Sequence, residues 1–109
     1  MAKGYWIAHL DILDPEFQKQ YVAANQAAFK KFGARYIIRG GKQIAGFPSA
    51  SRCAVKHGTM RDRHIVLEFD SYEQALACYE SAEYQAALKF RDRGSDVDVV
   101  IIEGYDPAK

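Results

Sequence analysis

The spacing of apolar side chains along the chain predicts four β-strands separated by two helical stretches. Residues 5–12 are aromatic and β-branched, without glycine or proline, which is typical of a strand. Side chains of a strand alternate between two faces, so Trp6 and Leu10 should share one face and Ile7 and His9 the other. Three further strands are expected over residues 34–39, 63–69 and 97–105.

A helix is expected between the first two strands. Its apolar stripe recurs at steps of three and four residues and consists of Phe17, Tyr21, Ala24 and Ala28. Asp14 is placed to cap the first turn, and Pro15 at the first helical position sacrifices no hydrogen bond. Gly33 suits the left-handed position that follows a helix, so the helix should end there.

A second helix is expected between the last two strands. Ser71 and Gln74 have the spacing of a capping box at its start. The sequence Ser-Ala-Glu that begins at Ser81 has the pattern of a fresh cap, which predicts a break in the helix at that residue. The helix should end near Gly94.

The order of these elements predicts the fold class. Residues 42–62 have no single period and are interrupted by glycine, proline and serine, which indicates a long surface loop with a short strand at 43–47. The remaining order is βαββαβ. Two right-handed βαβ units place both helices on one face of a four-stranded antiparallel sheet, which is the ferredoxin-like arrangement of the α+β class. A length of 109 residues gives room for one domain, spanning 1–109.

Parity along the strands assigns side chains to the two faces of this sheet. The residues expected to face the helices are Leu10, Ile38, Leu67 and Val100. The opposite face would carry Ile7, Ile37, Val66, Val99 and Ile101, mixed with His9, Arg39, Glu68 and Glu103. Because that surface is too apolar to be left in water, we expect a second copy of the sheet to cover it in a homodimer. The alternative is a monomer with scattered exposed apolar residues.

Six segments carry a resemblance to a known family. They are KGYWIA (3–8), YVAAN (21–25), YIIRGG (36–41), VLEF (66–69), CYESAEYQAA (78–87) and IEGY (102–105). Through them the chain resembles the bacterial family known as domain of unknown function 1330, within the dimeric α+β barrel superfamily. The resemblance implies a ferredoxin-like dimer and no assigned reaction. Related dimeric barrels include cofactor-free monooxygenases and lactone isomerases, which is a likeness of fold only.

His9, Arg39 and Glu68 are the candidate catalytic residues, because parity places them on the same largely apolar face of neighbouring strands. Glu68 is a candidate base, His9 a candidate proton shuttle, and Arg39 a candidate clamp for a carboxylate or enolate. The alternative is structural, with a salt bridge between Arg39 and Glu68 inside the dimer and His9 as a hydrogen-bonded wall residue.

Four helical residues are candidates for ligand binding, namely Asn25, Tyr79, Tyr84 and Arg91. Asn25 is offset by one residue from the apolar stripe and can reach the edge of a pocket, or bond to a backbone group. Tyr79, like Tyr21, also has the spacing of a core aromatic residue. Arg91 near a helix end can instead pack along its stem.

The spacing of the potential metal ligands and the motifs of the chain do not predict a metal or cofactor site. Cys53, His57 and His64 invite a metal interpretation, but Cys-x3-His is not a closed zinc pattern and a fourth ligand is missing, so no metal is expected. No glycine-rich phosphate loop, nucleophile elbow or paired-histidine helix occurs, so no cofactor is expected. The loop holds Lys42, Arg52, Lys56, Arg61 and Arg63, which favours either attraction of a small anionic metabolite or a plain solvated surface.

The net charge and the composition of the chain argue against nucleic acid and a membrane as binding partners. The net charge is only +1, and the third strand offers His64, Val66 and Glu68 where RNA-recognition domains of the same topology have stacking aromatics, so no nucleic acid is expected. The longest aliphatic run, 99–102, is far too short to cross a membrane. The first residues lack the apolar core of a signal peptide, so we expect a cytoplasmic protein.

Two functions remain in competition. The first is a small-molecule enzyme or binder, of the cofactor-free oxygenase or isomerase kind, that uses a pocket between the sheet and the helices. The second is a non-catalytic dimeric module that binds a ligand or regulates. The absence of a strong catalytic motif favours the second, and the three polar residues expected on one apolar face favour the first.

Overall fold

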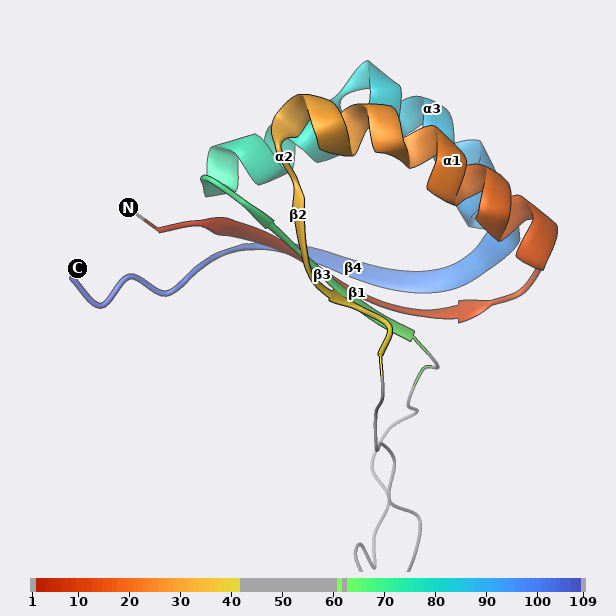
Figure 1. Ribbon diagram of the computed structural model, residues 1–109, viewed down its shortest axis with the longest axis horizontal. Coiled ribbons are helices and arrows are strands. Elements are labelled where there is room, and N and C mark those ends of the chain that lie inside the picture. Colours follow the sequence, from red (N-terminus) through yellow and green to blue (C-terminus); the bar gives the residue numbers. More distant parts are fainter. Residues whose placement is uncertain (1, 42–60, 62, 109) are drawn as a thin grey trace, which may run out of the picture.

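The computed structural model describes residues 2–41, 61 and 63–108. In chain order its elements are β1 (Gly4–Ile12), α1 (Pro15–Phe32), β2 (Arg35–Arg39), β3 (Arg63–Phe69), α2 (Tyr72–Glu80), α3 (Ala82–Gly94) and β4 (Ser95–Glu103). The strands form one antiparallel sheet in the order β2-β3-β1-β4. The helices lie together on one face of that sheet (Figure 1). The predicted ferredoxin-like α+β arrangement is confirmed, whereas the predicted strand at 43–47 lies outside the described residues.

The predicted ends of α1 are confirmed. The Asp14 side chain accepts a hydrogen bond from the Glu16 backbone N–H at 3.0 Å, and Pro15 occupies the first turn. At the other end, Gly33 has φ = 71° and donates its N–H to the Lys30 carbonyl at 3.4 Å. A residue with a Cβ is strained at that backbone angle, which explains why glycine ends the helix.

The predicted break at Ser81 is also confirmed. The hydroxyl of Ser71 caps α2 by accepting from the Gln74 N–H at 3.1 Å, and the hydroxyl of Ser81 accepts from the Tyr84 N–H at 3.1 Å. Ser81 therefore ends α2 and caps α3 at the same point. The last strand begins at Ser95, two residues before its predicted start, directly after α3. No helix in the described part of the chain is long and apolar enough to cross a membrane.

Trp6 lies at the centre of the buried core. Its indole N–H donates to the Ala75 carbonyl at 2.8 Å, so burial leaves no polar atom of this side chain unpaired. The Trp6 ring meets Phe29 and Tyr84 edge-on, with centroid distances of 5.4 and 4.9 Å, and Phe69 at a tilt at 5.6 Å. These ring contacts join β1 to both long helices and to β3.

The predicted faces of β4 are reversed. Val99 and Ile101 face the helices, since Ile101 pairs with the buried Trp6, and Val100 lies on the open face opposite Ile7 with 47% of its surface exposed. Both faces of β4 carry aliphatic side chains, so the alternation of residues along this strand could not show which face is buried. The register of β4 against β1 selects the buried face instead.

An irregularity in β2 overturns two further predictions. The register against β3 shifts between Tyr36, which pairs with Leu67, and Ile38, which pairs with Val66. Ile38 therefore lies on the open face, 45% exposed, rather than toward the helices. A shift of one residue moves every later side chain to the other face, so Arg39 lies on the helix side of the sheet.

The close approach of α1 and α3 gives a test of the packing. A Cβ added at Gly94 would lie 2.6 Å from the Gln18 backbone nitrogen, so the two helices would have to move apart. We expect Gly94→Ala to lower the free energy of unfolding by about 1–3 kcal/mol, measured by urea denaturation. Lys89→Ala, at an exposed position of α3, is the control and should have little effect. An unchanged midpoint for Gly94→Ala would contradict this packing.

Candidate functional site

A cavity of about 110 Å³ lies between the helices and the covered face of the sheet. Helices α1 and α3 line it from one side and all four strands line it from the other. Its apolar wall includes Trp6, Leu10, Phe29, Ile65, Leu67 and Val99. An apolar cavity of this order of size can hold a molecule such as benzene, so the space suits a ligand of about one ring.

One wall of the cavity carries a partly buried polar cluster, which consists of Tyr21, Tyr84 and Arg91 and which we call the tyrosine–arginine cluster. The hydroxyl oxygens of Tyr21 on α1 and Tyr84 on α3 are 2.7 Å apart. Arg91, seven residues after Tyr84 on the same helix, donates from Nη1 to the Tyr84 hydroxyl at 3.2 Å. Tyr84 is only 1% exposed, so this cluster is shielded from bulk water on the helix side.

One hydrogen bond of the cluster has a fixed direction. A guanidinium only donates, so the Tyr84 oxygen accepts from Arg91, whereas either phenol can be the donor in the bond between Tyr21 and Tyr84. Burial raises the pKa of Tyr84 and, more strongly, the pKa of Tyr21. Both phenols are therefore protonated at neutral pH and act as hydrogen-bond donors rather than as bases.

Two buried polar atoms beside the cluster have no hydrogen-bond partner in the described structure. One is a donor, Arg91 Nε, whose ion pair with Asp92 Oδ1 is long at 3.6 Å. The other is an acceptor, Gln18 Oε1. Asn25 is 4% exposed, its carbonyl oxygen accepts from Gln26 Nε2 at 2.8 Å, and its side chain also interacts with the Tyr21 hydroxyl. The cluster therefore has a buried guanidinium nitrogen that still lacks an acceptor.

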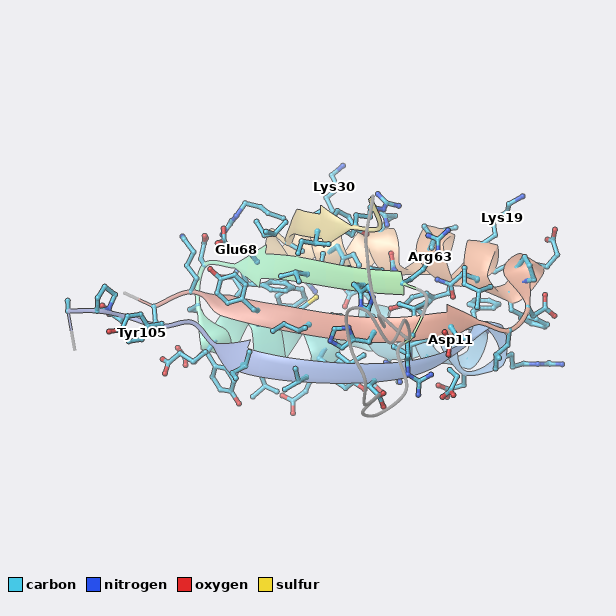
Figure 2. All side chains as sticks on the ribbon, turned by 90° about the horizontal axis from the view of Figure 1, so that it is seen from below. Asp11, Lys19, Lys30, Arg63, Glu68 and Tyr105 are labelled. Atoms are coloured by element: carbon cyan, nitrogen blue, oxygen red, sulfur yellow. The ribbon has the colours of Figure 1, made fainter. Side chains whose placement is uncertain are left out.

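Arg39, Gly40 and Arg63 line the cavity at the end of β2 and the start of β3, which we call its mouth. Both arginines are exposed, and the Arg39 guanidinium lies over the Tyr36 ring at 4.4 Å. Figure 2 labels Arg63 at the opposite end of β3 from Glu68. No Asp, Glu or His occurs among the described residues that line the cavity, so the lining is strongly positive.

The structure separates the three predicted catalytic residues. Arg39 lines the cavity, whereas His9 and Glu68 lie on the open face of the sheet, where they pair across strands with His64 and Tyr5. The prediction that they share one face is wrong, because the register shift in β2 carries Arg39 to the helix side. Alternation read from the sequence assumes an uninterrupted strand, and nothing in the residues 35–39 marks the irregularity.

The predicted salt bridge between Arg39 and Glu68 is likewise wrong. Glu68 accepts from the Tyr5 hydroxyl at 2.8 Å and from Arg35 Nε at 3.1 Å. Arg35 also pairs with Asp70 at 3.1 Å. The Tyr5 hydrogen bond and then the Arg35 guanidinium hold the pKa of Glu68 below its usual value. Glu68 is thus a carboxylate with two hydrogen-bond partners, and it lies near the end of β3, where Figure 2 labels it.

His9 and His64 lie side by side on the open face, with their Nδ1 atoms 2.6 Å apart. One imidazole must donate and the other accept, so this pair is a hydrogen-bonded element of the surface. Within the described residues, no group of three His, Cys, Asp or Glu side chains is arranged to hold a metal ion. The other two residues considered for a metal, Cys53 and His57, lie outside the described residues.

Three of the four predicted ligand-binding residues, Asn25, Tyr84 and Arg91, do line the cavity. Tyr79 does not line it, and packs instead against the Tyr84 ring at a centroid distance of 5.2 Å. From its spacing Tyr21 was expected to be a core aromatic residue, and Gln18 was not among the expected site residues. The signal that could have found both is their helical spacing, since Gln18, Tyr21 and Asn25 lie at i, i+3 and i+7 on one face of α1.

The chain belongs to the family described as domain of unknown function (DUF1330), whose model matches residues 3–105. The family description assigns no activity. No curated protein matches the sequence at a significant level.

Solved structures share the fold at low sequence identity. A protein of unknown function from Rhodopseudomonas palustris, RPA0582, is 13% identical with a TM-score of 0.70, over 97% of this chain and 85% of that chain. A protein of unknown function from Bacteroides thetaiotaomicron, described as a possible oxidoreductase, is 13% identical with a TM-score of 0.53, over 94% and 97%. A protein from Nitrosomonas europaea, provisionally assigned as an antibiotic biosynthesis monooxygenase, is 14% identical with a TM-score of 0.50, over 98% and 95%. At these identities the likeness shows the fold alone.

The partners of Glu68 give a pH-dependent prediction. Because folding lowers the pKa of this carboxyl, its stabilising effect is complete above the unfolded pKa of about 4.3 and is lost as the pH falls through the folded value. We expect Glu68→Gln to lower Tm most near about pH 7, and the difference from wild type to shrink toward about pH 3. Thermal unfolding followed by circular dichroism measures both.

Glu80→Gln, at an exposed carboxylate of α2, is the matched control for Glu68→Gln. We expect it to give a smaller difference in Tm at neutral pH. A Tm difference for Glu68→Gln that stays constant across the acid range would contradict the assignment of Arg35 and Tyr5 as its partners.

Proposed function

We propose that this protein is a small-molecule enzyme that binds an organic anion in the cavity between the sheet and the helices. The observation that carries the proposal is the buried Arg91 Nε without a hydrogen-bond partner at the tyrosine–arginine cluster, together with a lining that contains arginines and no described acid. A carboxylate or enolate oxygen bound there would accept from Arg91 and from a phenol. The ligand would thereby supply the acceptor that the buried Arg91 Nε lacks.

The chemistry that this arrangement favours is stabilisation of a developing oxyanion. Preorganised donors in a site shielded from water lower the energy of a charge that forms on the substrate. Enolisation, isomerisation and oxygenation of an electron-rich acid all pass through such an anion. The fold likeness to a possible oxidoreductase and to a provisionally assigned monooxygenase agrees with this class of reaction. Arg39 keeps an anion-binding role at the mouth, and the proposal gives His9 and Glu68 no step.

A second candidate is a non-catalytic module that binds the same anion. The observation that favours it is the lack of a general base, since no carboxylate or imidazole occurs among the described lining residues. Incubation of the protein with the acid that binds best, followed by mass spectrometry, separates the two functions. New product that depends on Tyr84 supports the enzyme, and unchanged acid supports the binding module.

We further propose that the open face of the sheet is covered by a second copy of the chain. Its exposed or half-exposed apolar residues are Ile7, Ile38, Val66, Val100 and Ile102. They lie next to one another across four strands, so together they make a continuous apolar surface. At one end of this face Arg61 binds three aspartates, Asp11, Asp96 and Asp98, at 3.0–3.3 Å. These charges would form the polar rim of the interface.

The ligand proposal predicts a thermal shift that depends on Arg91. A small aromatic or aliphatic carboxylate at 100 times its Kd should stabilise the wild type by about 2.7 kcal/mol, a shift of several degrees in Tm. We expect Arg91→Gln and Tyr21→Phe to reduce or abolish this shift, because each removes a donor from the cluster. The measurement is differential scanning fluorimetry across a panel of carboxylates.

Arg93→Gln is the matched control for Arg91→Gln. It removes the same charge from α3, at an exposed arginine whose guanidinium lies over Phe17 and does not line the cavity. We expect it to keep the full shift. Equal shifts in the Arg91→Gln and Arg93→Gln proteins would refute the assignment of the cavity.

The dimer proposal predicts the mass in solution. The wild type should sediment as two subunits of 12.3 kDa each. Val100→Lys places a charge on the open face without touching the buried core, and should shift the protein toward a single subunit. Leu13→Lys, at an exposed apolar position outside the sheet, should leave the dimer intact. A wild-type mass of one subunit at micromolar concentration would rule the dimer out.

A further inference from the structure

The cationic groups of the cavity occupy two separate places. Arg91 lies on α3 beside the β4 side of the sheet, and its side chain is 15% exposed. Arg39 and Arg63 lie on β2 and β3, toward the other edge of the sheet, and both are exposed. Because Arg91 is the least exposed of the three, we take its end of the cavity as the floor and the end with the two exposed arginines as the mouth.

Between these two places the cavity wall is apolar. Trp6 and Leu10 of β1, in the middle of the sheet, line it together with Val97 and Val99 of β4. A ligand that reaches from the mouth to the floor must therefore have an apolar middle. The volume of about 110 Å³ limits that middle to a few carbon atoms or one ring.

From this arrangement we propose that the ligand is a small dicarboxylic acid, with one carboxylate on the tyrosine–arginine cluster and the other between Arg39 and Arg63. This inference rests on the proposed function and specifies its substrate class. The first carboxylate supplies the acceptor that Arg91 Nε lacks. The second meets two guanidinium groups that line the mouth with no described acid beside them in the cavity.

The charge of the lining distinguishes a diacid from a monoacid. The described lining carries three arginines and no described aspartate or glutamate, so one carboxylate would offset only part of its positive charge. A carboxylate at the floor gains most, because Arg91 Nε is buried without a hydrogen-bond partner and its ion pair with Asp92 is long at 3.6 Å. The second carboxylate binds at the solvated mouth, where each charge contributes less and salt screens it.

The test compares acids that differ only in the second carboxylate. Succinate is paired with butyrate, glutarate with valerate, and benzene-1,3-dicarboxylate with benzoate, and Kd is measured by isothermal titration calorimetry. We expect at least one diacid to bind the wild type about tenfold or more tightly than its matched monoacid, with an advantage that falls as salt rises. Equal affinities within every pair would overturn the inference while leaving the proposed function in place.

Variants at the mouth complete the test. The double variant Arg39→Gln/Arg63→Gln should bring the Kd of the diacid close to that of the monoacid, and leave the monoacid nearly unchanged. The control Arg35→Gln/Arg93→Gln removes the same two charges from exposed arginines that do not line the cavity, and should keep the preference. A preference that survives the first double variant would overturn the inference. Failure of every acid to bind the wild type would refute the proposed function and this inference together.

Discussion

Helices on one side of a four-stranded sheet can cover only one of its faces, and every other feature of this protein follows from that asymmetry. The covered face meets α1 and α3 through aromatic rings, with Trp6 at the centre. The open face keeps an apolar middle, a histidine pair and a charged end where Arg61 joins three aspartates. We therefore propose a different role for each face, a ligand cavity on the covered face and a contact between two copies of the chain on the open face.

The covered face is not filled completely, and polar groups surround part of the unfilled space. Two phenols, a guanidinium and two amides converge from α1 and α3, and burial makes the unpaired Arg91 Nε and Gln18 Oε1 costly. A purely structural core would close such a space with aliphatic side chains. Donors kept neutral by burial, beside an arginine, are instead suited to hold an oxyanion in a fixed position.

The irregularity in β2 has the largest consequence of any local feature. A regular strand would place Arg39 on the open face with His9 and Glu68, where it was expected. The shift between Tyr36 and Ile38 turns it to the cavity, stacked on the Tyr36 ring at 4.4 Å. One residue of register thus decides whether Arg39 lines the cavity or lies on the open face.

Features whose cause is local could be predicted from the sequence. Asp14, Gly33 and Ser81 satisfy or end backbone hydrogen bonds within one turn, so the helix limits and the βαββαβ order follow from neighbouring residues. Three residues that line the cavity, Asn25, Tyr84 and Arg91, were also predicted from the sequence. Only the tertiary structure decided which parity of β4 is buried, on which side Arg39 lies, and that Tyr21 meets Tyr84, 63 positions away. Those outcomes depend on register and on contacts between distant segments, which alternation within a single strand or helix does not encode.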